Sequence, residues 1–196
     1  MNTQGGSVRE RGVDRRVART RKALGNALVE LMLARSFDEI TVQQVLDRAG
    51  VGRATFYAHF RNKHDLLLSD AERFFDALER HFMAGETGTR VAPVAELFAH
   101  VADYHRFSRA LEQSGAGEAV YDLLVGHLAG MIERRMAALR PDAGPGPLPP
   151  AAAARVLAGA LVEMMRWWLN RGARPSAAEM DAHYHEIVWG GLARIG

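Results

Sequence analysis

The sequence of 196 residues contains no cysteine. This absence excludes thiolate catalysis, cysteine-bound zinc, iron–sulfur clusters and disulfide bonds, and nothing indicates an oxidising compartment. No stretch approaches the roughly 18 uninterrupted apolar residues of a membrane helix, and the polar amino terminus lacks the apolar core of a secretion signal. We therefore expect a soluble cytoplasmic protein that has no membrane partner.

Patterns typical of β-strands are also missing, since no β-branched run of strand length alternates between apolar and polar residues. Proline is concentrated in one segment, because five of the seven prolines lie between Pro141 and Pro150 and indicate a linker loop. Elsewhere apolar residues recur with the 3.6-residue period of amphipathic helices. The sequence therefore predicts an all-α protein of about nine helices.

The expected helix boundaries follow from capping signals and glycines. Thr41 and Gln44 form a capping box, as do Ser176 and Glu179, so each pair opens a helix. The turn 50–52 separates two short helices and so indicates a helix-turn-helix. The expected helices run from residue 15 to about 35 and then over 41–49, 53–60, 63–84, 93–112, 117–139, 151–171 and 176–194.

No catalytic motif is present: the sequence has no HExxH, no P-loop and no nucleophile elbow. His100 and His105, and likewise His183 and His185, are poorly spaced to converge on a metal ion, which favours surface or hydrogen-bonded histidines. We therefore expect neither an enzyme nor a cofactor.

Charge is unevenly distributed along the chain. Residues 1–63 hold 12 basic and 6 acidic residues, whereas residues 64–196 hold 13 and 17. The densest basic run, Arg9 to Lys22, fits either a solvated terminus or an arm that contacts nucleic acid. This asymmetry indicates one module that meets a polyanion and a second module with another task.

Residues 41–63, TVQQVLDRAGVGRATFYAHFRNK, and the preceding RKALGNALVELMLARSFDEI closely resemble the amino-terminal domain of TetR/AcrR-type transcriptional regulators. The resemblance implies a homodimer that binds double-stranded DNA, usually as a repressor, and whose carboxy-terminal helices bind a small molecule. We expect a flexible basic arm over 1–14, a DNA-binding domain over 15–62 and a helical ligand-binding and dimerisation domain over 63–196.

One face of the helix after the turn has to reach the major groove while the other packs on its neighbours. Phe56 and Phe60 suit the packed face. The resemblance implies that Lys63 is a phosphate anchor, and Thr41 is placed to cap its helix and contact phosphate. Arg53 suits guanine or phosphate equally. The expected DNA-binding residues are Thr41, Arg53, Ala54, Thr55, Tyr57, His59 and Lys63.

The part of the chain after residue 63 is rich in aromatic residues, which suggests an apolar pocket among its helices, chiefly because of the resemblance. The expected pocket residues are Phe74, Phe98, Tyr104, Tyr121 and Trp167. Apolar stripes on the last two helices suggest a two-fold four-helix bundle, with burial within one subunit as the alternative. The expected interface residues are Leu161, Met165, Trp168, Tyr184 and Ile187.

We therefore expect a repressor that a small, largely apolar ligand releases from a palindromic operator. The alternative is a DNA-binding activator or architectural protein without an effector. Ligand-dependent release of DNA separates the two.

Overall fold

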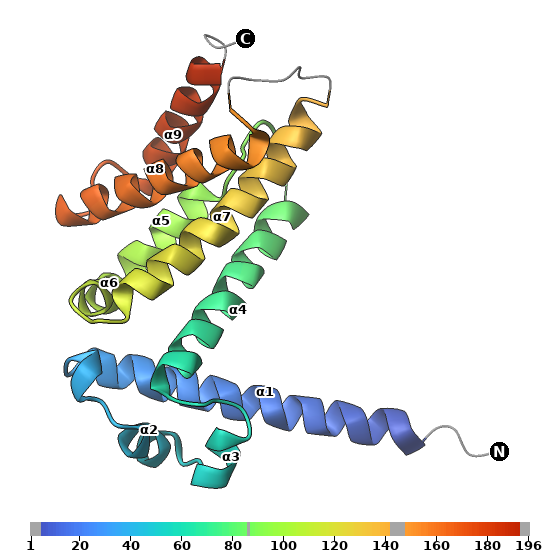
Figure 1. Ribbon diagram of the computed structural model, residues 1–196, viewed down its shortest axis with the longest axis vertical. Helices are drawn as coiled ribbons and strands as arrows, with labels where there is room; N and C mark the ends of the chain where they lie inside the picture. Colours follow the sequence, from blue (N-terminus) through green and yellow to red (C-terminus); the bar gives the residue numbers. More distant parts are fainter. Residues whose placement is uncertain (1–4, 86, 142–147, 193–196) are drawn as a thin grey trace. The chain divides into compact units, whose positions relative to one another are not determined.

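The computed structural model describes residues 5–85, 87–141 and 148–192, which form nine α-helices, one 3₁₀ turn and no strand (Figure 1). The predicted all-α fold is therefore confirmed. No helix within these ranges is long and apolar enough to cross a membrane. The elements are α1 (Gly5–Met32), η1 (Phe37–Glu39), α2 (Val42–Ala49), α3 (Arg53–Tyr57), α4 (Lys63–Ala84), α5 (Val94–Asp103), α6 (His105–Glu112), α7 (Gly117–Leu139), α8 (Pro150–Asn170) and α9 (Ala177–Leu192).

The chain divides into two compact units. Unit 1 comprises residues up to Asp70 together with Arg109–Ala116, and unit 2 comprises Ala71–Ser108 and the residues from Gly117 onward. Both α4 and α6 therefore contribute residues to each unit. The expected boundary, between residues 62 and 63, lies before α4 instead of within it.

The first helix begins at Gly5, about ten residues before the expected start at Arg15. The segment 5–14 contains no proline, so a helix nucleated further along the chain extends through it despite three glycines, which lower its helix propensity. The part of the predicted flexible arm from residue 5 onward is thus helical, and residues 1–4 lie outside the described ranges. The expected apolar face is confirmed, because Leu24, Leu28 and Met32 are buried.

Both predicted capping boxes are present. The Thr41 hydroxyl accepts a hydrogen bond from the Gln44 N–H at 3.3 Å, and the Thr41 N–H donates to Gln44 Oε1 at 2.9 Å. Ser176 and Glu179 make the same reciprocal pair at the start of α9, at 3.3 and 2.8 Å. These contacts satisfy amide groups that have no partner inside a helix.

The helix expected over 93–112 is divided into α5 and α6 at Tyr104, whose φ of −109° and ψ of 28° leave the helical region. Val94, Leu97 and Val101 form one buried stripe of α5. Continued as one helix, Leu111 would lie only about 40° around the axis from Leu97, so the apolar period gives no sign of this break. Leu111 belongs to unit 1, whereas α5 belongs to unit 2.

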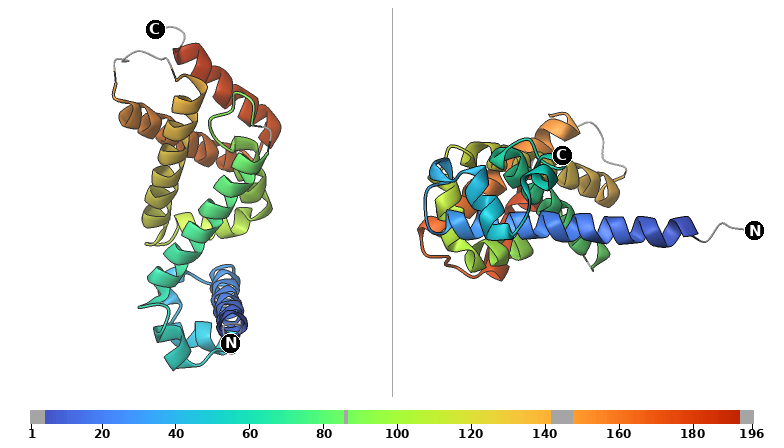
Figure 2. Two further views of the ribbon diagram at one scale, coloured as in Figure 1. Left: turned by 90° about the vertical axis from the view of Figure 1, so that its right-hand side faces the viewer. Right: turned by 90° about the horizontal axis from the view of Figure 1, so that it is seen from below.

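In unit 2, α7 packs along α8 and α5 packs against α9 (Figure 2). The centre of this core is an aromatic pair, because Phe98 and Trp168 are 0% and 2% exposed and their ring centroids lie 4.8 Å apart. The Trp168 indole N–H donates to the Pro175 carbonyl at 2.6 Å, and the Tyr184 hydroxyl donates to the Leu157 carbonyl at 3.0 Å. Both large polar aromatics are thus buried with a hydrogen-bond partner.

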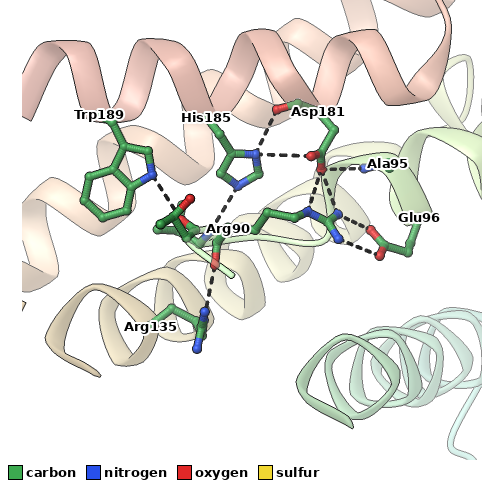
Figure 3. A network of polar contacts seen from close by, with 9 residues as sticks. Arg90, Ala95, Glu96, Arg135, Asp181, His185 and Trp189 are labelled. Carbon is green, nitrogen blue, oxygen red and sulfur yellow. Dashed lines mark hydrogen bonds and ion pairs between the residues drawn. The ribbon is translucent and has the colours of Figure 1, made fainter. Parts of the chain in front are cut away.

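A polar network fastens the segment before α5 to α9 (Figure 3). Arg90 contacts Glu96 at 2.5 Å and Asp181 at 2.7 Å. Burial alone raises the pKa of Asp181, but hydrogen bonds from His185 and Arg90 outweigh it and hold this pKa below its ordinary value. His185 Nε2 accepts from the Val91 N–H at 3.0 Å, so its proton lies on Nδ1, which donates to the Asp181 carbonyl at 2.8 Å.

Candidate nucleic-acid interface

The local sequence of unit 1 determines how α3 is presented. Gly50 closes α2 with a φ of 64°, a left-handed conformation that glycine adopts without strain. Helix α3 is shorter than the expected 53–60, but the N–H of Phe60 still donates to the Phe56 carbonyl at 2.9 Å. The segment up to Phe60 therefore keeps a helix-like turn.

Two phenylalanines anchor one face of this segment, as predicted. Phe56 and Phe60 are 0% and 2% exposed, and their ring centroids lie 5.7 Å apart. Burial of both rings fixes the rotation of α3 about its axis. The opposite face is accessible to solvent, including Arg53, Ala54, Thr55 and Tyr57, while His59 is half-buried.

Arg53 and Tyr57 stand one helical turn apart on the exposed face. The guanidinium carbon of Arg53 lies 5.7 Å from the centre of the Tyr57 ring, within the range of a cation–π interaction. Tyr57 is 49% exposed, although its ring meets Phe56 edge to face at 5.2 Å. The pair is therefore held by the core beneath it and still offers a guanidinium fork and a hydroxyl to solvent.

Thr41 is confirmed as the cap of α2, and it is exposed. Its contact with phosphate stays a prediction.

Lys63 has a different environment from the one expected. The Lys63 ammonium donates to the carbonyls of Phe37, Asp38 and Ile40 at 2.7, 3.0 and 2.8 Å, and it lies 4.6 Å from the centre of the Phe37 ring.

An ammonium has three N–H donors, so these three carbonyls use all of them. Lys63 therefore holds the turn η1, which leads into α2, and would have to give up these bonds to bind phosphate. The sequence could not reveal this role, because the three carbonyls belong to a turn more than twenty residues away.

The five expected pocket residues do not share one environment. Phe98 belongs to the core, Trp167 is 46% exposed, and Tyr121 lies beneath the guanidinium of Arg166 at 4.8 Å. The tryptophan at the buried position is Trp168. The expected pocket therefore stays a prediction, in which Phe98 is a core residue and Trp167 lies on the surface.

His100, expected as a surface or hydrogen-bonded histidine, links Phe74 to Tyr104. His100 stacks on Phe74 with ring centroids 4.0 Å apart and on Tyr104 at 4.7 Å. Burial lowers the pKa of His100 despite the opposing charge of Asp103, so the imidazole is neutral at pH 7. This stack joins α4 to α5 within unit 2.

Four of the five expected interface residues are buried within the subunit. Leu161, Met165, Trp168 and Tyr184 are between 0% and 3% exposed. The alternative of burial within one subunit is thus the correct one for these four, because a side chain without exposed surface has nothing to offer a second copy. Ile187 is 67% exposed and stays a candidate.

Comparison with known proteins identifies similar sequences and folds. Residues 26–69 match the family model described as bacterial regulatory proteins, tetR family. The HTH-type transcriptional regulator YxbF of Bacillus subtilis strain 168, itself uncharacterised, is 36% identical over 66 residues, which are 33% of this chain and 17% of that protein. The chain thus matches only a small part of the length of this relative.

Solved structures resemble the chain over most of its length. A TetR transcriptional regulator from Streptococcus agalactiae 2603V superposes with a TM-score of 0.64 at 24% identity, over 91% of this chain and 98% of that one. NalD of Pseudomonas aeruginosa, the secondary repressor of the MexAB-OprM multidrug efflux pump, superposes with a TM-score of 0.61 at 20% identity, over 89% of this chain and 96% of that one. At such identities the likeness shows a shared fold.

Replacing Lys63 with Met tests its role. The change removes the ammonium but keeps the apolar stem, so we expect the free energy of unfolding to fall by about 2 kcal/mol, since a hydrogen bond from a charged donor is worth about 1.5 to 3. The salt dependence of DNA binding should not change. Chemical denaturation and DNA titrations at several salt concentrations measure both quantities.

The matched control is Lys22→Met, because Lys22 is the only other lysine and is exposed on α1. This control should leave stability unchanged. A Lys63→Met protein of normal stability, whose salt slope falls by about one unit, would restore Lys63 as a phosphate contact.

Proposed function

Because the amino-terminal domain of the chain belongs to the TetR family of bacterial regulatory proteins, we propose that the protein is a homodimeric repressor that a small, largely apolar ligand releases from a palindromic operator. The observation that supports this most is the exposed face of α3, opposite the buried Phe56 and Phe60.

In the proposed complex the exposed face of α3 lies in the major groove. Arg53 reads a guanine through O6 and N7, because its guanidinium is a planar fork whose geometry matches these two acceptors. Tyr57 limits the motion of Arg53 and offers its hydroxyl to a base or phosphate. Thr55, Ala54 and His59 border the groove, and Thr41 contacts phosphate at the amino terminus of α2.

Replacing Arg53 with Ala should relax the preference for one base pair in each half-site, because discrimination by a bidentate arginine is worth about 1 to 3 kcal/mol. Replacing Arg61 with Ala is the matched control, since Arg61 is also exposed and lies beyond α3. Titrations against a library of single-base variants of the operator measure the effect. Base preferences that stay unchanged in the Arg53 variant would leave Arg53 with a phosphate contact only.

The proposed dimer uses the outward faces of α8 and α9. Val156, Ala160, Glu163 and Trp167 follow one another at intervals of three or four residues, so they share a face of α8 opposite its buried residues. Val156 and Trp167 are 62% and 46% exposed, and Ile187 on α9 is 67% exposed. A second copy of the chain covers these apolar side chains in an isologous contact, in which the same surface serves both subunits.

Substituting Val156 or Ile187 with Glu should produce folded monomers, because a charge placed in this contact loses its hydration. Leu161→Glu should instead lower the free energy of unfolding by several kcal/mol, since Leu161 is fully buried in the subunit. Light scattering and circular dichroism distinguish the two outcomes. Intact dimers of both surface variants would place the interface elsewhere.

The proposed effector binds beside the stacked rings of Phe74, His100 and Tyr104. Tyr104 is 52% exposed, so one end of the stack is open to a further ring. The neutral imidazole favours an uncharged or weakly polar aromatic-sized ligand. Helix α4 extends from this stack into the DNA-binding unit, and we infer that its movement changes the separation of the two recognition helices.

A ligand-responsive repressor and a regulator without an effector are distinguished by whether operator DNA changes the affinity for the ligand. An effector that lowers operator affinity about 5- to 150-fold must lose the same factor of its own affinity when operator is present. Fluorescence titrations of the tryptophans with and without operator measure both values. A ligand whose affinity does not depend on DNA would favour the regulator without an effector.

A further inference from the structure

Arg21 belongs to the basic run of the sequence, but it is engaged inside unit 1. Its Nη2 donates a hydrogen bond to the Ser69 hydroxyl of α4 at 2.8 Å. Its guanidinium carbon also lies 5.1 Å from the centre of the Phe60 ring, at the end of the recognition segment. One side chain of α1 therefore contacts both α4 and the segment that presents α3.

The environment of Arg21 is costly for stability. Its Nε is buried and has no hydrogen-bond partner. Burying an N–H without a partner is unfavourable, and such groups in folded proteins call for an explanation. An apolar side chain at this position would avoid the cost, which suggests that the guanidinium has a role other than stabilising the fold.

The two helices meet closely beside this contact. One turn further along α1, a Cβ atom at Gly25 would lie only 1.6 Å from Asp70 Oδ2, so no larger side chain fits without movement of Asp70. Ser69 and Asp70 are the last residues of α4 that belong to unit 1. Arg21 thus contacts α4 at its last residues in unit 1, and Gly25 leaves room there for the Asp70 carboxylate.

Aromatic contacts continue from Phe60 to the exposed face of α3. Phe60 packs on Phe56 at 5.7 Å, Phe56 meets Tyr57 at 5.2 Å, and the Arg53 guanidinium lies 5.7 Å from the Tyr57 ring. The contacts from Ser69 through Arg21 to Arg53 are therefore contiguous, and every residue in them belongs to unit 1.

We propose that Arg21 is a positioning residue for sequence-specific DNA recognition, which sets the orientation of α3 relative to α4 through Phe60. This inference depends on the proposed function, because it requires that α3 reads DNA. It assigns Arg21 a different task from the exposed arginines of α1, whose charge is available to phosphate. Removing Arg21 should therefore impair specific binding and leave non-specific attraction to DNA intact.

The test compares affinities for two duplexes at several salt concentrations: one selected by the wild-type protein from a randomised library, and one with the same bases scrambled. Arg21→Ala should lower affinity for the selected duplex about 2- to 30-fold. Its affinity for the scrambled duplex and its salt slope should match those of the wild type. Ser69→Ala should act in the same direction, and the double variant should resemble Arg21→Ala because both changes break the same contact.

The matched control is Arg19→Ala, which removes an exposed cation of the same helix and should leave the ratio of the two affinities unchanged. Arg21→Lys keeps the charge but not the planar fork, so it should recover only part of the ratio. If Arg21→Ala does not fold, the Ser69→Ala and Arg21→Lys proteins decide the question.

Three results would overturn this inference, and a fourth would overturn the proposed function itself. Equal loss for both duplexes with a salt slope lower by about one unit would make Arg21 a phosphate contact. A lower melting temperature with an unchanged affinity ratio would make its role structural only. If the wild-type protein selects no sequence from the library, the proposed function itself is overturned. If it does select one, but every variant keeps the wild-type ratio of the two affinities, only this inference is overturned.

Discussion

The burial of Phe56 and Phe60 determines the direction of every side chain that α3 exposes to solvent. Helix α3 has five residues, too few to be stable by itself, so its rotation is set by these two rings in the core of unit 1. Arg53 and Tyr57 then face solvent because they lie on the other side of the helix. A loss of packing at Phe60 would therefore change the exposed face without altering any residue on it.

The excess of basic residues in the first third of the chain overstates the charge available to DNA. Lys63 gives its three donors to backbone carbonyls, and Arg21 lies between Ser69 and Phe60. Both cations organise the fold around α3. In the proposed complex, exposed residues such as Arg15, Arg16, Arg19 and Arg53 supply the electrostatic attraction.

Local signals in the sequence predicted local structure well. The capping boxes at Thr41 and Ser176, the turn at Gly50 and the buried pair in α3 depend on residues close together in the chain, and the structure has all of them. The break at Tyr104 was missed because Leu111 keeps the helical period of Leu97, so the apolar pattern indicates one continuous helix. The surroundings of Lys63 and Trp167 were not predicted, because they come from distant segments, which periodicity does not specify.

Burial also reversed the expectation for the last two helices. An apolar stripe on a helix indicates which face is covered, but it does not say whether the same subunit or a second copy covers it. The stripe that includes Leu161 and Trp168 turned out to be core, and the opposite face, with Val156 and Trp167, is left exposed. The sequence pattern of that exposed face is weaker because alanine and glutamate interrupt it.

Methylation protection of operator DNA tests the central claim most directly, because dimethyl sulfate modifies guanine N7 in the major groove. Docking of the exposed face of α3 predicts two groups of protected guanines, related by two-fold symmetry and separated by about one helical turn or a small multiple of it. Arg53→Ala should remove protection at one guanine in each group. Protection confined to adenine N3 in the minor groove, or to a single group, would contradict the account.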